Sequence, residues 1–97
     1  MTSTEFKSSL RNSSPPESIK GLLLALWHDA KGDWHSAHKI AQDFETHDGS
    51  WVHAYLHRKE EDDSNARYWY SRARKKFPKV SLETEWDEIA TYLLENS

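Results

Sequence analysis

Apolar residues recur at spacings of three and four positions through most of the chain, which is the periodicity of helices that bury one face. The first such stretch is expected to begin at a Ser14 cap, with two prolines in its first turn, and to run to about Lys31. Gly32 follows, and glycine suits the left-handed position just beyond a helix end. The pattern therefore predicts a first helix with a sharp turn after it.

A second helix is predicted from a cap at Asp33 to about Glu45. Its apolar stripe comprises Trp34, Ala37, Ala41 and Phe44. The stretch THDGS, residues 46–50, has the composition of a turn, and a third helix is expected after it, from Trp51 to about Glu60. The short link between the first two helices predicts that they pack as an antiparallel pair.

Two further helices are expected in the last third of the chain. Residues 62–64, Asp-Asp-Ser, offer a turn and a cap for the fourth helix, and Pro78 ends it. Ser81 caps a fifth helix that runs towards the end of the chain. Their apolar stripes are Ala66, Trp69, Tyr70 and Ala73 in the fourth, and Trp86, Ile89, Ala90, Leu93 and Leu94 in the fifth. The acidic residues of the fifth helix are expected on its other faces: Glu83, Glu85, Asp87 and Glu88. This amphipathic helix is suited to close the exposed end of a helical stack.

The start of the chain has a different character. It is rich in serine and threonine, with only Phe6 and Leu10 as apolar anchors, so it cannot offset its own ordering entropy. We expect residues 1–14 to be a flexible tail or a loosely docked arm. Residues 15–97 are expected to form a single all-helical domain.

Charge and composition narrow the classes of partner. The 97 residues carry 13 Lys and Arg against 16 Asp and Glu, a formal charge of -3, so no overall positive field draws the protein to nucleic acid or to an anionic membrane. The longest apolar run, Leu22 to Trp27, is far shorter than the roughly 20 residues that span a bilayer. Cysteine is absent, and the start lacks the apolar core of a signal peptide. We therefore expect a cytoplasmic protein that does not bind membranes.

The two helix pairs share positions when the chain is shifted on itself by 29 residues. The shift matches Ala25 with Ala54, His28 with His57, Asp33 with Asp62, and Ala37 with Ala66. Small residues at these spacings let paired helices approach closely. The sequence therefore predicts one helix-turn-helix unit used twice.

The second unit carries a pattern of small, small, aromatic, small and proline residues: Ala54, Ala66, Tyr70, Ala73 and Pro78. This pattern resembles a tetratricopeptide repeat, and Sel1-like repeats share much of it. The resemblance covers about Ile19 to Pro78, and residues 81–97 stand in the place of the family's end-capping helix. It implies two tandem antiparallel repeats in a fragment of a right-handed superhelix.

The first unit is a degenerate copy of this pattern. It keeps Ala25 and Ala37, but it has Ala41 where the family favours an aromatic residue and Phe44 where the family favours a small one. The link between the two units is also several residues shorter than in the family. The packing angle between the units is therefore not implied by the resemblance.

The resemblance implies a scaffold that binds a peptide or a partner protein on the concave face made by the first helix of each unit. Carried over position by position, this predicted concave face presents Leu22, Leu26, Asp29, Trp51, Tyr55 and Arg58. The residues are compatible with such a binding face, because the run from Leu22 to Trp27 is apolar on nearly every side of its helix. This is more apolar surface than a single buried stripe requires. That excess must meet a second surface: the capping helix, another copy of the chain in a homodimer, or a partner.

Histidines suggest a second chemistry. His53 and His57 are four residues apart, and His35 and His38 are three apart, so each pair lies on one side of its helix. Together they are candidates for a zinc or nickel site. The segment HAYLH lacks the glutamate of a zinc-protease motif. The alternative is plain packing, because His28 and His57 occupy matching positions of the two units.

No residue pattern favours catalysis. Several serines lie at helix caps or in first turns, no nucleophile-base pair is visible, and the three glycines are too scattered for a phosphate loop. Residues 64–79 carry six basic residues and no acidic one beside several aromatics, but these cations complement a helix end and face an acidic helix start. We therefore expect a binding module without a cofactor, and neither an enzyme nor a nucleic-acid-binding protein.

Overall fold

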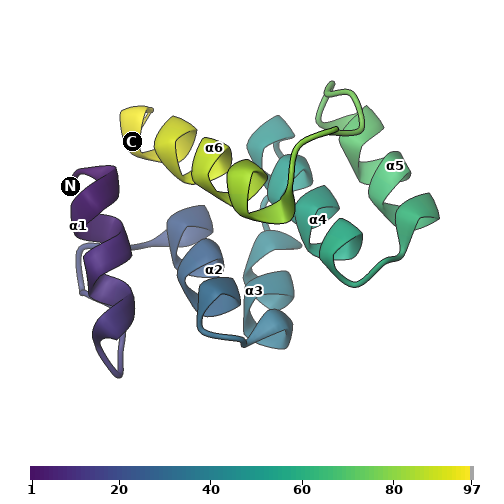
Figure 1. The fold of residues 1–97 in the computed structure, drawn as a ribbon. Coiled ribbons are helices and arrows are strands. Elements are labelled where there is room, and N and C mark those ends of the chain that lie inside the picture. Colours follow the sequence, from purple (N-terminus) through teal and green to yellow (C-terminus); the bar gives the residue numbers. More distant parts are fainter. Residues whose placement is uncertain (97) are drawn as a thin grey trace.

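The computed structural model describes residues 1–96, in which every regular element is a helix (Figure 1). In chain order these are α1 (Ser3–Ser8), the short 3-10 helix η1 (Ser9–Arg11), α2 (Gly21–Ala30), α3 (Trp34–Ala41), α4 (His47–Lys59), α5 (Asp63–Arg72) and α6 (Leu82–Glu95). The predicted all-α class is confirmed. None of the helices in residues 1–96 is long and apolar enough to cross a membrane.

The turn between α2 and α3 and the turn between α4 and α5 are built in the same way. Gly32 has a φ of 85° in the first turn, and Glu61 has a φ of 65° at the equivalent place in the second. The aspartate that follows, Asp33 or Asp62, caps the next helix through its side chain and donates its own amide to a carbonyl five residues before it, at 2.9 Å in both turns. The repetition of residues therefore corresponds to a repetition of turn geometry.

Two helix starts differ from the expected ones. The helix α2 begins at Gly21 rather than near Ser14, because a turn closed by Ile19 N–H and Pro16 C=O comes first and Lys20 is extended, with φ -138° and ψ 165°. The prolines thus lie in a loop.

The helix α4 begins at His47, so THDGS is its cap and first turn rather than a separate turn. Thr46 accepts a hydrogen bond from the Gly49 amide at 3.0 Å, which is the geometry of an N-cap. The preceding helix α3 ends at Ala41 instead of about residue 45. The chain at Phe44 then passes close to Gly49 in the first turn of α4. A Cβ at position 49 would lie 2.0 Å from the Phe44 carbonyl oxygen, so only glycine permits this approach.

Of the two alternatives for the start of the chain, a flexible tail or a docked arm, the structure has the docked arm. Phe6 of α1 is fully buried, and its ring stacks on Trp86 of α6 with centroids 5.6 Å apart. Lys7 forms an ion pair with Asp87 at 2.8 Å, and the Lys31 ammonium donates to the Leu10 carbonyl at 2.7 Å. A single buried aromatic ring, with these polar contacts around it, thus attaches the first helix to α6 and α2.

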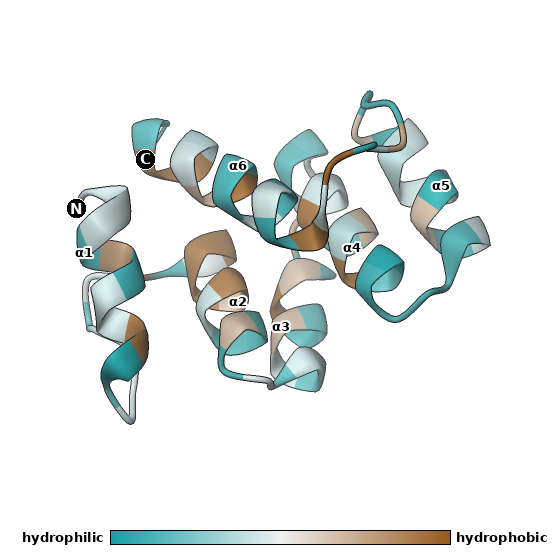
Figure 2. Ribbon diagram, in the orientation of Figure 1, coloured by the Kyte–Doolittle hydropathy of each residue, from teal (hydrophilic) through white to brown (hydrophobic). Residues whose placement is uncertain are grey.

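The last helix, α6, lies across α2 and α4 rather than extending the row of helix pairs (Figure 1). The Trp86 indole donates to the Leu26 carbonyl at 3.2 Å, which anchors α6 on α2. Figure 2 shows that α2 is apolar along most of its length, and it contacts α3, α4 and α6. Part of the apolar surface of α2 is therefore covered by α6, while Leu23 and Leu24 stay partly exposed.

Candidate functional site

The six residues of the predicted concave face lie on α2 and α4. Leu22, Leu26 and Asp29 come from α2, and Trp51, Tyr55 and Arg58 come from α4. The first five are at most 8% exposed, and Arg58 is half-buried. These six residues are therefore largely enclosed within the chain.

A buried carboxylate on α6 organises one half of this face. Glu85 is 1% exposed and accepts hydrogen bonds from the Trp51 indole at 3.2 Å, the Arg58 guanidinium at 2.8 Å and the Tyr70 hydroxyl at 2.6 Å. Burial and the carboxylate together raise the pKa of Tyr70, so its hydroxyl stays a donor. Arg58 also donates to the Val80 carbonyl. Glu85 was expected on an outer face of its helix, and its burial corrects that expectation.

A second buried carboxylate joins α2 to α4. Asp29 is 2% exposed and accepts hydrogen bonds from the Tyr55 hydroxyl at 3.1 Å and from the Lys59 ammonium at 2.9 Å. Burial, followed by the charge of Asp29, raises the pKa of Tyr55. Charged hydrogen bonds of this kind satisfy the buried carboxylate and hold the two first helices at a fixed separation.

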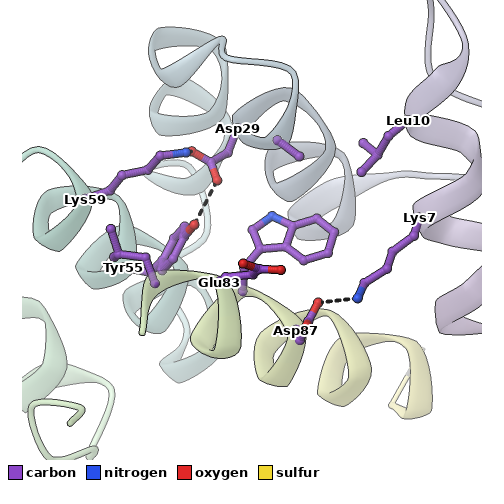
Figure 3. A pocket seen from close by; sticks show the side chains of 10 residues that line it. Lys7, Leu10, Asp29, Tyr55, Lys59, Glu83 and Asp87 are labelled. Atoms are coloured by element: carbon purple, nitrogen blue, oxygen red, sulfur yellow. Dashed lines mark hydrogen bonds and ion pairs between the residues drawn. The ribbon is translucent and has the colours of Figure 1, made fainter. Parts of the chain in front are cut away.

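An open groove of about 430 Å³ runs beside Asp29 and Tyr55 (Figure 3). It is lined by Lys7, Leu10, Asp29, Ala30, Tyr55, Lys59, Leu82, Glu83, Trp86 and Asp87. In Figure 3 the ion pair of Lys59 with Asp29 lies on one side of the groove, and that of Lys7 with Asp87 lies on the other. An apolar floor between two charged rims is a common form of binding site for a small segment of another molecule.

Only Asp29 and Tyr55 of the six predicted residues line this groove. Three of the others were missed for a definite reason. Lys7 and Leu10 belong to the segment that was expected to be a tail or a loosely docked arm, and Trp86 was assigned only to the core stripe of its helix. The docking of Phe6 makes these residues part of a groove, and the sequence carries no local signal for that contact.

The four candidate histidines separate into a cluster of three and one outlier. One ring nitrogen from each of His38, His53 and His57 lies within 4.8 Å of the other two. His35 is exposed, and its ring makes a T-shaped contact with Trp34. Three of the four candidate histidines therefore lie together, and His35 is not part of the cluster.

Comparisons of the chain with family models, with curated proteins and with solved structures found no match. The functional argument therefore depends on the chemistry and geometry of the residues themselves. Two features offer such chemistry: the groove between α1 and α4, and the histidine cluster between α3 and α4.

Proposed function

We propose that this protein is a small interaction module built on tetratricopeptide-like helix pairs, and that it binds a segment of a partner protein in the groove between α1 and α4. The observation that carries the proposal is the groove itself, an apolar floor with ion pairs on both sides. The helix α6 packs on α2 and α4, which carry the predicted concave face, and the groove is the open surface beside α6.

The groove indicates what the partner segment contains. Trp86, Leu10 and Leu82 offer apolar surface to one inserted side chain, and a large apolar or aromatic residue suits that floor. The side chains of Lys7 and Lys59 remain 51% and 39% exposed, so each can pair with an acidic group of the segment. We therefore propose a partner segment with one bulky apolar residue flanked by acidic residues.

The lining favours binding over catalysis. Among the ten residues that line the groove there is no serine, cysteine or histidine, the usual components of a nucleophile-base pair. The one tyrosine among them, Tyr55, has a raised pKa and donates a hydrogen bond to Asp29. These features support a recognition surface.

The test fills the groove without disturbing the core. Replacement of Trp51 or Tyr55 would remove buried packing, so loss of binding there would not separate recognition from unfolding. Ala30 is exposed, ends α2 and lines the groove, so Ala30→Arg places a long side chain in the groove while the added cation complements the helix dipole. Gln42→Arg is the matched control, because it makes the same charge change at the exposed end of α3.

Random peptides displayed on phage are selected against the wild-type protein, and selected peptides are then measured by fluorescence anisotropy with both variants. We expect peptides with an apolar residue between acidic ones, with affinity lowered at least tenfold by Ala30→Arg and unchanged by Gln42→Arg. Equal binding to the Ala30→Arg protein would exclude the groove. A selection that enriches no peptide would contradict the interaction-module proposal as a whole.

A further inference from the structure

The histidine cluster lies on the side of α4 away from the groove. His53 and His57 are each two residues from a groove-lining residue, Tyr55 or Lys59, and two residues correspond to about 200° of rotation around a helix. The third member, His38, comes from α3. The cluster therefore lies between the two helix pairs, and it is independent of the proposed partner groove.

The ring nitrogens converge at short distances. His38 Nε2 and His53 Nε2 are 3.0 Å apart, and one nitrogen of each of the three rings lies within 4.8 Å of the other two. Tetrahedral zinc with Zn–N bonds of about 2.0 Å requires its nitrogens to be roughly 3.3 Å apart. The hydrogen-bonded pair of His38 and His53 is already close to that separation.

A carboxylate orients the third imidazole, that of His57. His57 Nδ1 and Glu60 Oε1 form a hydrogen bond of 2.6 Å, which fixes the orientation of the ring. Carboxylates that orient metal-binding histidines in this way are a regular outer shell of zinc sites.

Two tryptophans hold the rings in place. Trp34 stacks on His38 with centroids 4.8 Å apart, and Trp69 stacks on His53 with centroids 3.9 Å apart. The Trp34 indole is itself fixed by a hydrogen bond to the Leu56 carbonyl at 2.8 Å. Ligands that are oriented before the ion arrives lose less conformational freedom on binding it.

We propose that His38, His53 and His57 bind one divalent transition-metal ion of the class that prefers imidazole, with Zn²⁺ as the expected ion and water as its fourth ligand. Three nitrogen donors suit Zn²⁺, Ni²⁺ or Cu²⁺ and do not suit Mg²⁺ or Ca²⁺, which take oxygen ligands. A bound ion would join α3 to α4 and so fix the angle between the two helix pairs.

The test uses the full chain without a histidine tag, freed of metal by dialysis against a chelator. Zn²⁺ is titrated calorimetrically, and Co²⁺ is titrated by visible absorption, which reports tetrahedral coordination. We expect one ion per chain, an affinity loss of more than about 100-fold in His38→Gln and in His53→Gln, and a loss of about 10- to 100-fold in Glu60→Gln. His35→Gln is the matched control on the same helix as His38 and should bind as the wild type does.

A measurement on the wild type guards against variants that fail to fold. In a nitrogen-15 spectrum of the imidazoles, Zn²⁺ should shift the resonances of the three clustered histidines and leave that of His35 in place. The melting temperature should rise by about 10 °C or more at a hundredfold excess of Zn²⁺ over Kd and return with chelator. Absence of saturable binding, equal weakening by His35→Gln, or shifts spread over all six histidines would overturn the proposal.

Discussion

The buried Glu85 carboxylate should be the most sensitive polar position in the protein. Its two oxygens receive hydrogen bonds from an indole, a guanidinium and a phenol, and these donors come from α4 and α5 while Glu85 itself is on α6. The change Glu85→Gln keeps the size of the side chain, but it replaces one acceptor oxygen with a donor and removes the charge opposite Arg58. At least one of the three donors would then face another donor in the core.

The expected cost follows from these contacts. A lost hydrogen bond to a charged group costs about 1.5–3 kcal/mol, and an unpaired member of a buried ion pair costs about 3–5 kcal/mol. Arg58 is 16% exposed at its side chain and can turn partly towards water, so the lower part of this range applies. We expect Glu85→Gln to lower the free energy of unfolding by about 3 kcal/mol, which corresponds to a fall in Tm of about 12–24 °C for a chain of this size.

Urea unfolding followed by tryptophan fluorescence, together with a thermal melt by circular dichroism, would measure this cost. Glu88→Gln is the matched control, because Glu88 is exposed on the same helix and its loss should change stability by no more than about 0.5 kcal/mol. In a double-mutant cycle with Arg58→Met, the two changes should cost less together than the sum of their separate costs. A cost below about 1 kcal/mol for Glu85→Gln would refute the reasoning that this carboxylate holds α6 on the other helices.

Two further predictions concern the docked N-terminal segment and the histidine cluster. Phe6→Ala should lower the free energy of unfolding by about 3 kcal/mol in the same urea assay and release α1 to rapid hydrogen exchange, because the ring is fully buried; unchanged protection of α1 would contradict the docking. His53 should titrate by NMR in the metal-free protein with a pKa of about 4, below its usual 6.5. Because its folded-state pKa is lowered, the unfolded state binds the proton first, so His53 should cost stability as pH falls from about 6.5 to about 4; titration near 6.5 would exclude that burial.

Local sequence patterns were enough to predict the main helices and several of their caps. Periodicities of three and four positions follow from helix geometry alone, so the main helices were found in the right order. The caps at Asp33 and Ser81 were also predicted correctly, because each depends on a side chain that bonds an amide three residues later. For the fourth helix the sequence offered residues 62–64, and the cap is Asp62.

The sequence did not decide where a segment is compatible with both a helix start and a loop. Ser14 and Thr46 are both good cap residues, but only Thr46 starts a helix in the structure. At this helix start Gly49 lets the chain at Phe44 pass within contact distance, which the composition of the segment did not reveal.

The sequence by itself determined that this chain forms a series of amphipathic helices with two similar turns, because those features depend on residues that are neighbours along the chain. The tertiary structure alone decided that α6 lies across α2 and α4, that Glu85 is buried, and that His38 meets the histidines of α4. These contacts join residues far apart in the sequence. Which face meets which depends on the summed packing of all the helices rather than on any local pattern of residues.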